Sequence, residues 1–200
     1  MAFLNLADWV DCTEVEGPGR RFALWVQGCL QRCPECCNPH MFDIVPRTIV
    51  EAGEVVRLVR SARDRYQIEG VSFLGGEPML QAQGLVIVSE ELRKDQLSVI
   101  TFTGYVLEEL QTMGLPGATA LIALSDIIVD GPYRSDLPEA HRNWVGSANQ
   151  RFHFLTSRYR PGIEYDPAFP HGFEVRVGKA GLRANGWPVA LDGDASVKQS

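Results

Sequence analysis

Four of the chain's five cysteines lie within nine positions, in the stretch WVQGCLQRCPECCNPHMF at residues 25–42. This feature constrains the chain most, because few chemistries place thiols so close together. The fifth cysteine, Cys12, makes the count odd, and the adjacent Cys36 and Cys37 are strained partners for each other. A disulfide scaffold is therefore disfavoured, and a metal or redox site on one loop is favoured.

Cys29, Cys33 and Cys36 have the spacing C-x3-C-x2-C. A structural zinc site normally takes four ligands, often as two separated pairs, and here His40 would have to be the fourth. A redox pair of Cys33 and Cys36 fits less well, because a third cysteine stands close by. An iron–sulfur cube usually takes four cysteines, so three would leave one iron open to a substrate or cofactor. Zinc stays an alternative.

The rest of the chain alternates short apolar strands with helices. A turn at EGPG precedes a strand at 20–27, and a helix is predicted over 47–66, with Thr48 as N-cap and Glu51 completing a capping box. Further strands, each with the polar or Gly-rich residues that end it, are predicted within 69–78, 97–105 and 126–133, and further helices at 79–94, 106–113 and 118–125. This order predicts parallel βα units.

Unusual residues follow each predicted strand. They are the cysteines, Gly75-Gly76-Glu77, Thr103-Gly104 and Asp130. Ligands of parallel α/β folds bind at the carboxyl ends of the strands, so we expect these residues to form one site.

The C-terminal part is less regular. FEVRVGKAGLRANGWPVAL at 173–191 alternates like a hairpin, and DGDASVKQS at 192–200 reads as a polar, frayed tail. We expect residues 1–160 to form the core and residues 161–200 an extension of the same domain.

Charge and hydropathy limit the possible partners and the cellular location of the protein. The net charge of −6 argues against nucleic acid as a partner. No apolar run approaches the roughly 20 residues that span a bilayer, and the N-terminus lacks the pattern of a signal peptide. These features predict a cytoplasmic protein without a membrane partner.

The cysteine triplet with a downstream Gly-Gly-Glu strand end resembles the radical S-adenosylmethionine (SAM) superfamily. EGPGRRFALWVQGCLQRCPECCNP, FLGGEP, TFTGY, IIVDGPY and WVGSANQR resemble, in that order, segments of anaerobic ribonucleotide reductase activating proteins, which are small glycyl-radical activases. The resemblance covers about residues 12–160. It implies an α/β fold, a partial, open (β/α) barrel with mostly parallel strands and a C-terminal extension.

The resemblance also implies a ligand set. Cys29, Cys33 and Cys36 would bind three irons of a 4Fe–4S cluster, and no catalytic residue is expected beyond the cluster and the SAM site. SAM would lie against Glu35, Cys36, Cys37, Gly75, Gly76, Glu77, Thr103, Gly104 and Asp130. The glycines would allow close approach of SAM to the backbone. Glu35 stands where many superfamily members carry a ring for the adenine.

The implied activity is reductive cleavage of SAM to a 5′-deoxyadenosyl radical, which would generate a glycyl radical on a partner such as anaerobic ribonucleotide reductase. An electron donor such as flavodoxin or ferredoxin would be needed. One alternative is a radical SAM enzyme acting directly on a peptide or small molecule. Another is a non-catalytic Fe–S or zinc interaction module, against which Glu77 and its glycines argue.

Overall fold

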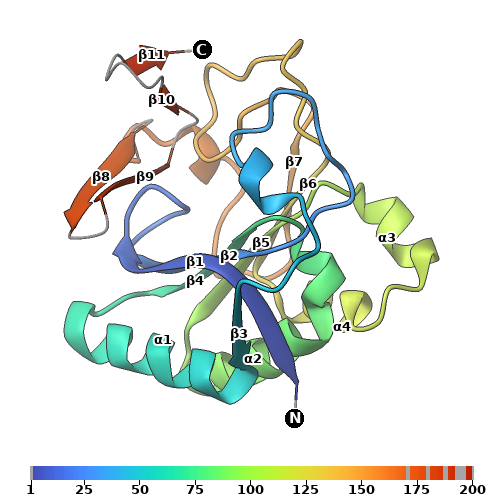
Figure 1. Cartoon of the computed structure of the whole chain (residues 1–200), viewed down its shortest axis with the longest axis vertical. Helices are drawn as coiled ribbons and strands as arrows, with labels where there is room; N and C mark the ends of the chain where they lie inside the picture. Colours follow the sequence, from blue (N-terminus) through green and yellow to red (C-terminus); the bar gives the residue numbers. More distant parts are fainter. Residues whose placement is uncertain (1, 170–171, 179–180, 187–188, 192–196, 200) are drawn as a thin grey trace.

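A computed structural model describes residues 2–169, 172–178, 181–186, 189–191 and 197–199. Its largest element is a seven-stranded sheet with the order β3-β1-β2-β4-β5-β6-β7 (Figure 1). The strands are β1 (Phe3–Thr13), β2 (Arg21–Val26), β3 (Thr48–Glu51), β4 (Gly70–Gly75), β5 (Ser98–Phe102), β6 (Ile127–Asp130) and β7 (Arg151–Phe154).

The centre of this sheet is parallel. Strands β2, β4, β5 and β6 pair in parallel, whereas β1, β3 and β7 are antiparallel to their neighbours. The predicted α/β class with parallel βα units is confirmed. Within the described residues β3 and β7 are the two edges of an open sheet and no closed barrel forms. The partial barrel therefore stays a prediction.

The helices pack on one face of the sheet. They are α1 (Ala52–Tyr66), α2 (Ala82–Lys94), α3 (Leu107–Met113) and α4 (Ala118–Leu124). The chain also forms three 3-10 turns, which are η1 (Pro39–Met41), η2 (Pro78–Gln81) and η3 (Ile163–Tyr165). Figure 1 shows α1 and α2 beneath the sheet. None of the described helices is both long enough and apolar enough to cross a membrane.

Alternation along β2 separates the two faces of the sheet. Phe22, Leu24 and Val26 are buried in the main core with residues of α1 and α2. Ala23 and Trp25 point to the opposite face, where they pack with Met41. Because successive side chains of a strand point to opposite sides, this second face is free to border a ligand site.

The predicted helix over 47–66 is wrong in its first turn. Thr48–Glu51 form strand β3, which pairs antiparallel with Phe3–Leu6 of β1, and the helix begins at Ala52. Glu51 is the N-cap and its side chain makes no capping hydrogen bond, so the capping box does not form. Pairing with β1 outweighs the local capping pattern.

Two further strand pairs follow the sheet. Strands β8 (Phe173–Gly178) and β9 (Gly181–Gly186) are antiparallel, and they lie within the stretch for which the sequence predicts a hairpin. Strand β11 (Val197–Gln199) pairs antiparallel with β10 (Val189–Leu191), and it lies within the stretch that the sequence predicts to be a frayed tail. The rest of the predicted tail, 192–196 and 200, lies outside the described residues. The division at residue 160 stays a prediction.

Candidate iron–sulfur and cofactor site

One cavity of about 480 Å³ lies at the carboxyl ends of the parallel strands. The predicted site residues that line it are Cys29, Cys33, Cys36, Cys37, Gly75, Gly76, Glu77, Thr103 and Gly104. Trp25, Leu74 and Phe102, from β2, β4 and β5, also line it. Its volume is in the range of small-molecule and cofactor sites. The structure thus brings most of the predicted residues to one place.

Backbone hydrogen bonds fix the cysteine loop at the end of β2. The amide of Gly28 donates to Met41 O at 2.9 Å, and the amide of Cys29 donates to Phe42 O at 3.0 Å. The side chain of Gln27 donates to Asp43 O at 2.7 Å. The loop therefore returns to its own starting point, and both of its ends are anchored at the sheet edge.

Backbone N–H groups surround the sulfur atoms of the loop. The amide of Asn38 donates to Cys36 Sγ at 3.4 Å. Burial raises the pKa of Cys29 and of Cys33, and backbone hydrogen bonds to each sulfur act in the opposite direction. A hydrogen bond from Cys37 lowers the pKa of Cys36 to about 6. Such donors favour the thiolate, which is the form that binds metal.

The donor set fits an iron–sulfur cube. Three thiols with N–H donors around them line one cavity, and hydrogen bonds to sulfur are a usual part of iron–sulfur sites. Among the described residues, no three His, Cys, Asp or Glu side chains are grouped as the ligands of one ion. A cube distributes its thiolates over separate irons, so it does not need such a group. His40, the zinc ligand considered above, lines the same cavity.

The strand ends of β2 and β4 meet at Gly75 and Gly76. The amide of Gly76 donates to Val26 O at 2.7 Å, and that of Glu77 donates to Gly28 O at 2.8 Å. A Cβ at Gly76 would overlap the carbonyl of Gly28, and one at Gly75 would lie 2.6 Å from Val26 N. The expected reason for these glycines was space for a cofactor. The structure instead fills that space with the backbone of β2 and of the cysteine loop.

Glu77 joins the ends of β4 and β5. Its Oε1 accepts hydrogen bonds from Met79 N and Thr103 Oγ1, both at 2.9 Å, and its Oε2 accepts one from Gly104 N at 2.8 Å. The residue is only 1% exposed. Burial raises the pKa of Glu77 to about 7, although the three hydrogen bonds act to lower it. The carboxyl group thus holds Thr103 and Gly104 beside the cavity.

Two predicted residues, Asp130 and Glu35, are not among the described residues that line the cavity. The buried Asp130 carboxylate pairs with Arg151 Nη2 at 2.5 Å and accepts a hydrogen bond from Leu107 N at 2.7 Å. It therefore connects β6, β7 and the start of α3. Glu35 is exposed, at a left-handed turn position with φ of 57°.

Sequence reasoning missed Glu16, a second buried carboxyl group on the cavity wall. Burial raises the pKa of Glu16 to about 7, and its Oε1 accepts a hydrogen bond from Asn185 Nδ2 at 3.1 Å. Ser72 Oγ donates to its carbonyl oxygen at 2.6 Å, and the fully buried Arg21 donates to Pro18 O at 3.1 Å. These contacts fix the EGPG turn. The sequence signalled only a turn there.

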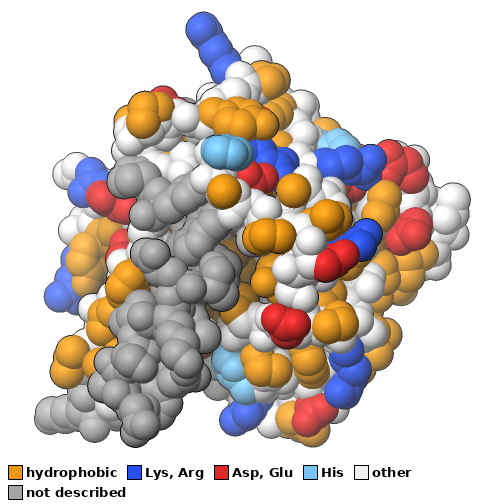
Figure 2. Space-filling view, turned by 90° about the horizontal axis from the view of Figure 1, so that it is seen from above, with side chains coloured by type: hydrophobic (Ala, Val, Ile, Leu, Met, Phe, Trp, Pro, Cys, Tyr) orange, Lys and Arg blue, Asp and Glu red, His pale blue; other side chains and the backbone are white. Residues whose placement is uncertain are grey.

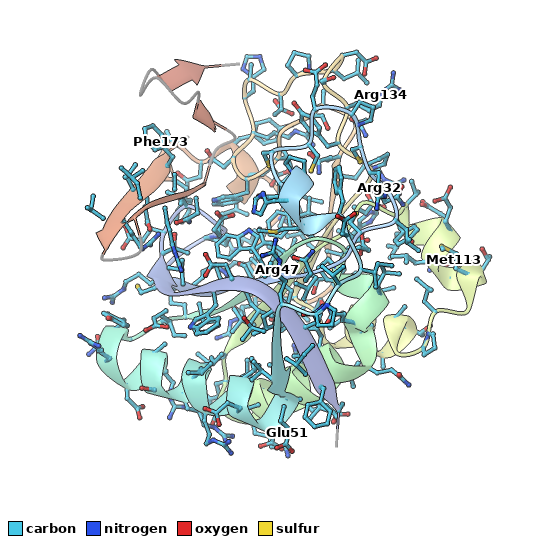
Figure 3. All side chains as sticks on the ribbon, viewed as in Figure 1. Arg32, Arg47, Glu51, Met113, Arg134 and Phe173 are labelled. Atoms are coloured by element: carbon cyan, nitrogen blue, oxygen red, sulfur yellow. The ribbon has the colours of Figure 1, made fainter. Side chains whose placement is uncertain are left out.

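A third group of cavity residues comes from β8 and β9, at the upper left of Figure 1. This group forms one wall of the cavity and includes Phe173, Arg176, Arg183 and Asn185. In the view of Figure 3, Phe173 and Arg32 of the cysteine loop lie to the left and right in the upper half of the molecule. Residues 131–150 add Gly131, Tyr133, Trp144, Gly146 and Gln150 to the lining.

Known proteins match the part of the chain that contains the cysteine loop and the ends of β2, β4 and β5. The family model described as a 4Fe-4S single cluster domain matches residues 15–153. An anaerobic ribonucleoside-triphosphate reductase-activating protein of Enterobacteria phage T4 is 30% identical over 145 residues, which cover 70% of this chain and 87% of the relative. The chain belongs to the family of these 4Fe-4S activating proteins.

Relatives of the same name occur in bacteria. The one from Escherichia coli (strain K12) is 28% identical over 159 residues, and the one from Vibrio cholerae is 27% identical over 158 residues. Each match covers 76% of this chain and 99% of the relative. The resemblance stated from the sequence is therefore confirmed. The residues matched by the family model end at 153, before β8 and β9 begin.

Proposed function

We propose that this protein is a radical SAM enzyme of the activase type. It binds a 4Fe–4S cluster through Cys29, Cys33 and Cys36 and cleaves SAM reductively. The product is a glycyl radical on a partner protein, an anaerobic ribonucleotide reductase. The observation that carries the proposal is that the three cysteines and Gly75–Glu77 line one cavity at the carboxyl ends of β2 and β4.

The cofactors would supply the radical chemistry: a cluster held by Cys29, Cys33 and Cys36 would provide the electron for reductive cleavage of SAM. The protein provides position and shielding. The three thiolates hold the cluster, and the segment around Gly76 and Glu77 borders the place for SAM. Trp25, Leu74 and Phe102 give the cavity an apolar lining that limits the access of water.

The partner is proposed from the relatives, which are named for activating an anaerobic ribonucleoside-triphosphate reductase. On the face shown in Figure 2, acidic and basic side chains are interspersed among hydrophobic ones. A mixed surface of this kind does not distinguish an interface from other protein surface, so the partner is proposed from the relatives alone. An electron donor such as flavodoxin or ferredoxin is part of the proposal, because the reaction consumes one electron for each SAM.

The test compares Cys36→Ala with Cys12→Ala after anaerobic reconstitution. Cys36 lines the cavity, whereas Cys12 lies half-buried on β1 and packs against the main core. We expect the wild type and Cys12→Ala to hold about four irons per chain and to form 5′-deoxyadenosine from SAM and dithionite. Cys36→Ala should lose both properties.

A candidate reductase is then added and its glycyl radical is measured by electron paramagnetic resonance. Loss of the cluster in Cys12→Ala, or its full retention in Cys36→Ala, would contradict the ligand assignment. A wild-type protein that holds four irons but forms no 5′-deoxyadenosine, with the reductase present, would show a non-catalytic cluster protein. Cleavage of SAM without a radical on any reductase would point to a peptide or small-molecule substrate.

A further inference from the structure

Trp144 is an aromatic residue of the cavity wall to which the proposed function gives no role. It lines the cavity together with Gly146 and Gln150 of the same segment. Val145, between them, is 2% exposed and packs in the core formed with Ile100 and Val129. The segment therefore turns Val145 into the protein and leaves the indole of Trp144 at the cavity.

The backbone at Trp144 is strained. Its φ is 68°, in the left-handed region that bulky side chains rarely adopt. Such strain persists only where the surrounding structure enforces it, and it is concentrated at functional sites. Trp144 therefore combines a strained backbone with a place in the cavity wall.

A dense set of hydrogen bonds enforces this conformation on both sides of Trp144. Gln150 Oε1 accepts from Gly146 N at 3.0 Å and from Ser147 N at 3.1 Å. Arg142 donates to Gln150 O at 2.8 Å, and Asn143 N donates to Glu164 O at 2.7 Å. The segment is thus closed upon itself and tied to the region of η3. These hydrogen bonds therefore fix the backbone that carries the indole of Trp144.

The ring contact of Trp144 leaves room for a ligand. Phe169 lies 5.5 Å from the indole, centroid to centroid, with the planes tilted by 55°. A tilted neighbour braces the indole through an edge contact without covering it as a parallel ring would. Trp144 can therefore keep its position and still offer aromatic surface to the cavity.

We propose that Trp144 provides the aromatic surface for the purine of SAM. The proposal rests on the proposed function and adds a residue that positions the nucleoside. Every base has a π-face that stacks on aromatic side chains. The cysteine loop offers no ring at Glu35, which is exposed. The other Phe, Tyr and Trp residues of the cavity wall lie elsewhere in the chain: Trp25 and Phe102 in the sheet, Phe42 at the end of the cysteine loop, Tyr133 after β6 and Phe173 in β8.

The experiment compares Trp144→Leu with Trp144→Phe in the reconstituted holoprotein. Leucine retains an apolar side chain against Phe169 but removes the aromatic face, and phenylalanine retains both. Tyr165→Leu is the matched control, because Tyr165 is an exposed ring on η3 that is not among the described cavity residues. Dissociation constants are measured by equilibrium dialysis for SAM and for 5′-deoxyadenosine, beside iron per chain.

We expect Trp144→Leu to weaken the binding of both probes by about tenfold or more. Trp144→Phe should stay within about threefold of the wild type, and Tyr165→Leu should bind as the wild type does. Iron content should be equal in all four proteins. Unchanged affinity of Trp144→Leu for both probes overturns the inference while leaving the proposed function intact.

A second outcome also overturns it. If Trp144→Leu loses affinity for SAM and binds 5′-deoxyadenosine normally, the indole meets the sulfonium or amino-acid part instead of the purine. A wild-type holoprotein that binds no SAM contradicts the proposed function itself. The two failures are therefore distinct.

Discussion

At the scale of single residues, Gly76 shows how tightly the cysteine loop is joined to the sheet. Its amide donates to Val26 O, and the next amide, that of Glu77, donates to Gly28 O. A side chain at Gly76 would overlap the backbone of Gly28, directly before Cys29. Backbone atoms cannot rotate away as the end of a flexible side chain can. A substitution here must therefore displace the loop or the end of β4.

We predict that Gly76→Ala impairs cluster retention as well as SAM binding. The displaced loop carries Cys29, so iron per chain after anaerobic reconstitution should fall by about half or more. The control is Gly53→Ala, because Gly53 lies in α1 with no atom within 4 Å of the added Cβ. That variant should hold iron normally, and its free energy of unfolding should rise by at most about 0.5–1 kcal/mol, the value for a helix interior, because Gly53 lies in the first turn of α1. Normal iron content in Gly76→Ala, with SAM binding lost, would instead support the expectation drawn from the sequence.

Side-chain contacts decide which predicted residues reach the cavity. Strand ends could be located in the sequence, so Gly75, Glu77 and Thr103 were expected near the cysteines, and they line the cavity with them. The engagement of the Asp130 carboxylate by Arg151, 21 positions away, could not be read from a strand-end pattern. Glu16 was missed for a similar reason, because its burial depends on Asn185, 169 positions away.

At the scale of elements, polar contacts hold β8 and β9 against β1 and the turn that follows it. Arg183 pairs with Asp8 at 2.8 Å, and Arg176 donates to Cys12 O at 3.0 Å. Asn185 donates to Thr13 Oγ1 at 3.1 Å. The described residues of β8 and β9 take no part in the buried apolar clusters. Since each such hydrogen bond contributes only about 0.5–1.5 kcal/mol, this wall should open more easily than the sheet.

We predict that Arg183→Ala increases amide hydrogen exchange in residues 173–186, with little change in β2 and β4. The variant removes the ion pair with Asp8, so opening should become about two- to fivefold more frequent. Val177→Ala is the control in the same strand pair, because Val177 is 82% exposed. Exchange is measured by mass spectrometry of the holoprotein. Equal protection of 173–186 in the wild type and in Arg183→Ala would contradict the polar attachment.

The start of α1 shows where local patterns fail. Thr48 and Glu51 have the spacing of a capping box, yet both belong to β3. Ile49, at helical spacing from Val56, is 54% exposed on that strand, while Val56 is buried on α1. The strand forms because β1 offers an edge at Phe3–Leu6. A partner more than 40 positions away is not visible to a pattern that spans four residues.

At the scale of the whole molecule, the order of the strands and helices could be predicted from the sequence, whereas the position of β8 and β9 beside the cavity could not. Repeated apolar strands and amphipathic helices predict parallel pairing, because a helical crossover brings the next strand back in the same direction. This reasoning located β2, β4, β5 and β6 and their shared edge. It could not locate β8 and β9 on the cavity, since polar contacts from a distant segment leave no periodic signal.

The cavity also links the stability of the whole molecule to pH, through two buried carboxyl groups. Burial raises the pKa of Glu16 and of Glu77 from 4.5 to about 7. Between these values the folded protein binds more protons than the unfolded chain, so the unfolding free energy falls as pH rises. The contribution of each group is fully present below pH 4.5 and is lost as pH passes about 7. Its size is on the order of 3 kcal/mol per group.

We predict that Glu16→Gln removes one of these contributions. Glutamine does not titrate and can still accept the hydrogen bond from Asn185 Nδ2, so the variant imitates the protonated acid. Between pH 5 and pH 8, the unfolding free energy of the wild type should fall by about 2–3 kcal/mol relative to that of the variant. Anaerobic urea unfolding of both proteins measures this difference, and groups that titrate equally in both cancel. A constant difference across that range would mean that Glu16 titrates in the folded protein as it does in the unfolded chain, which its burial beside Asn185 argues against.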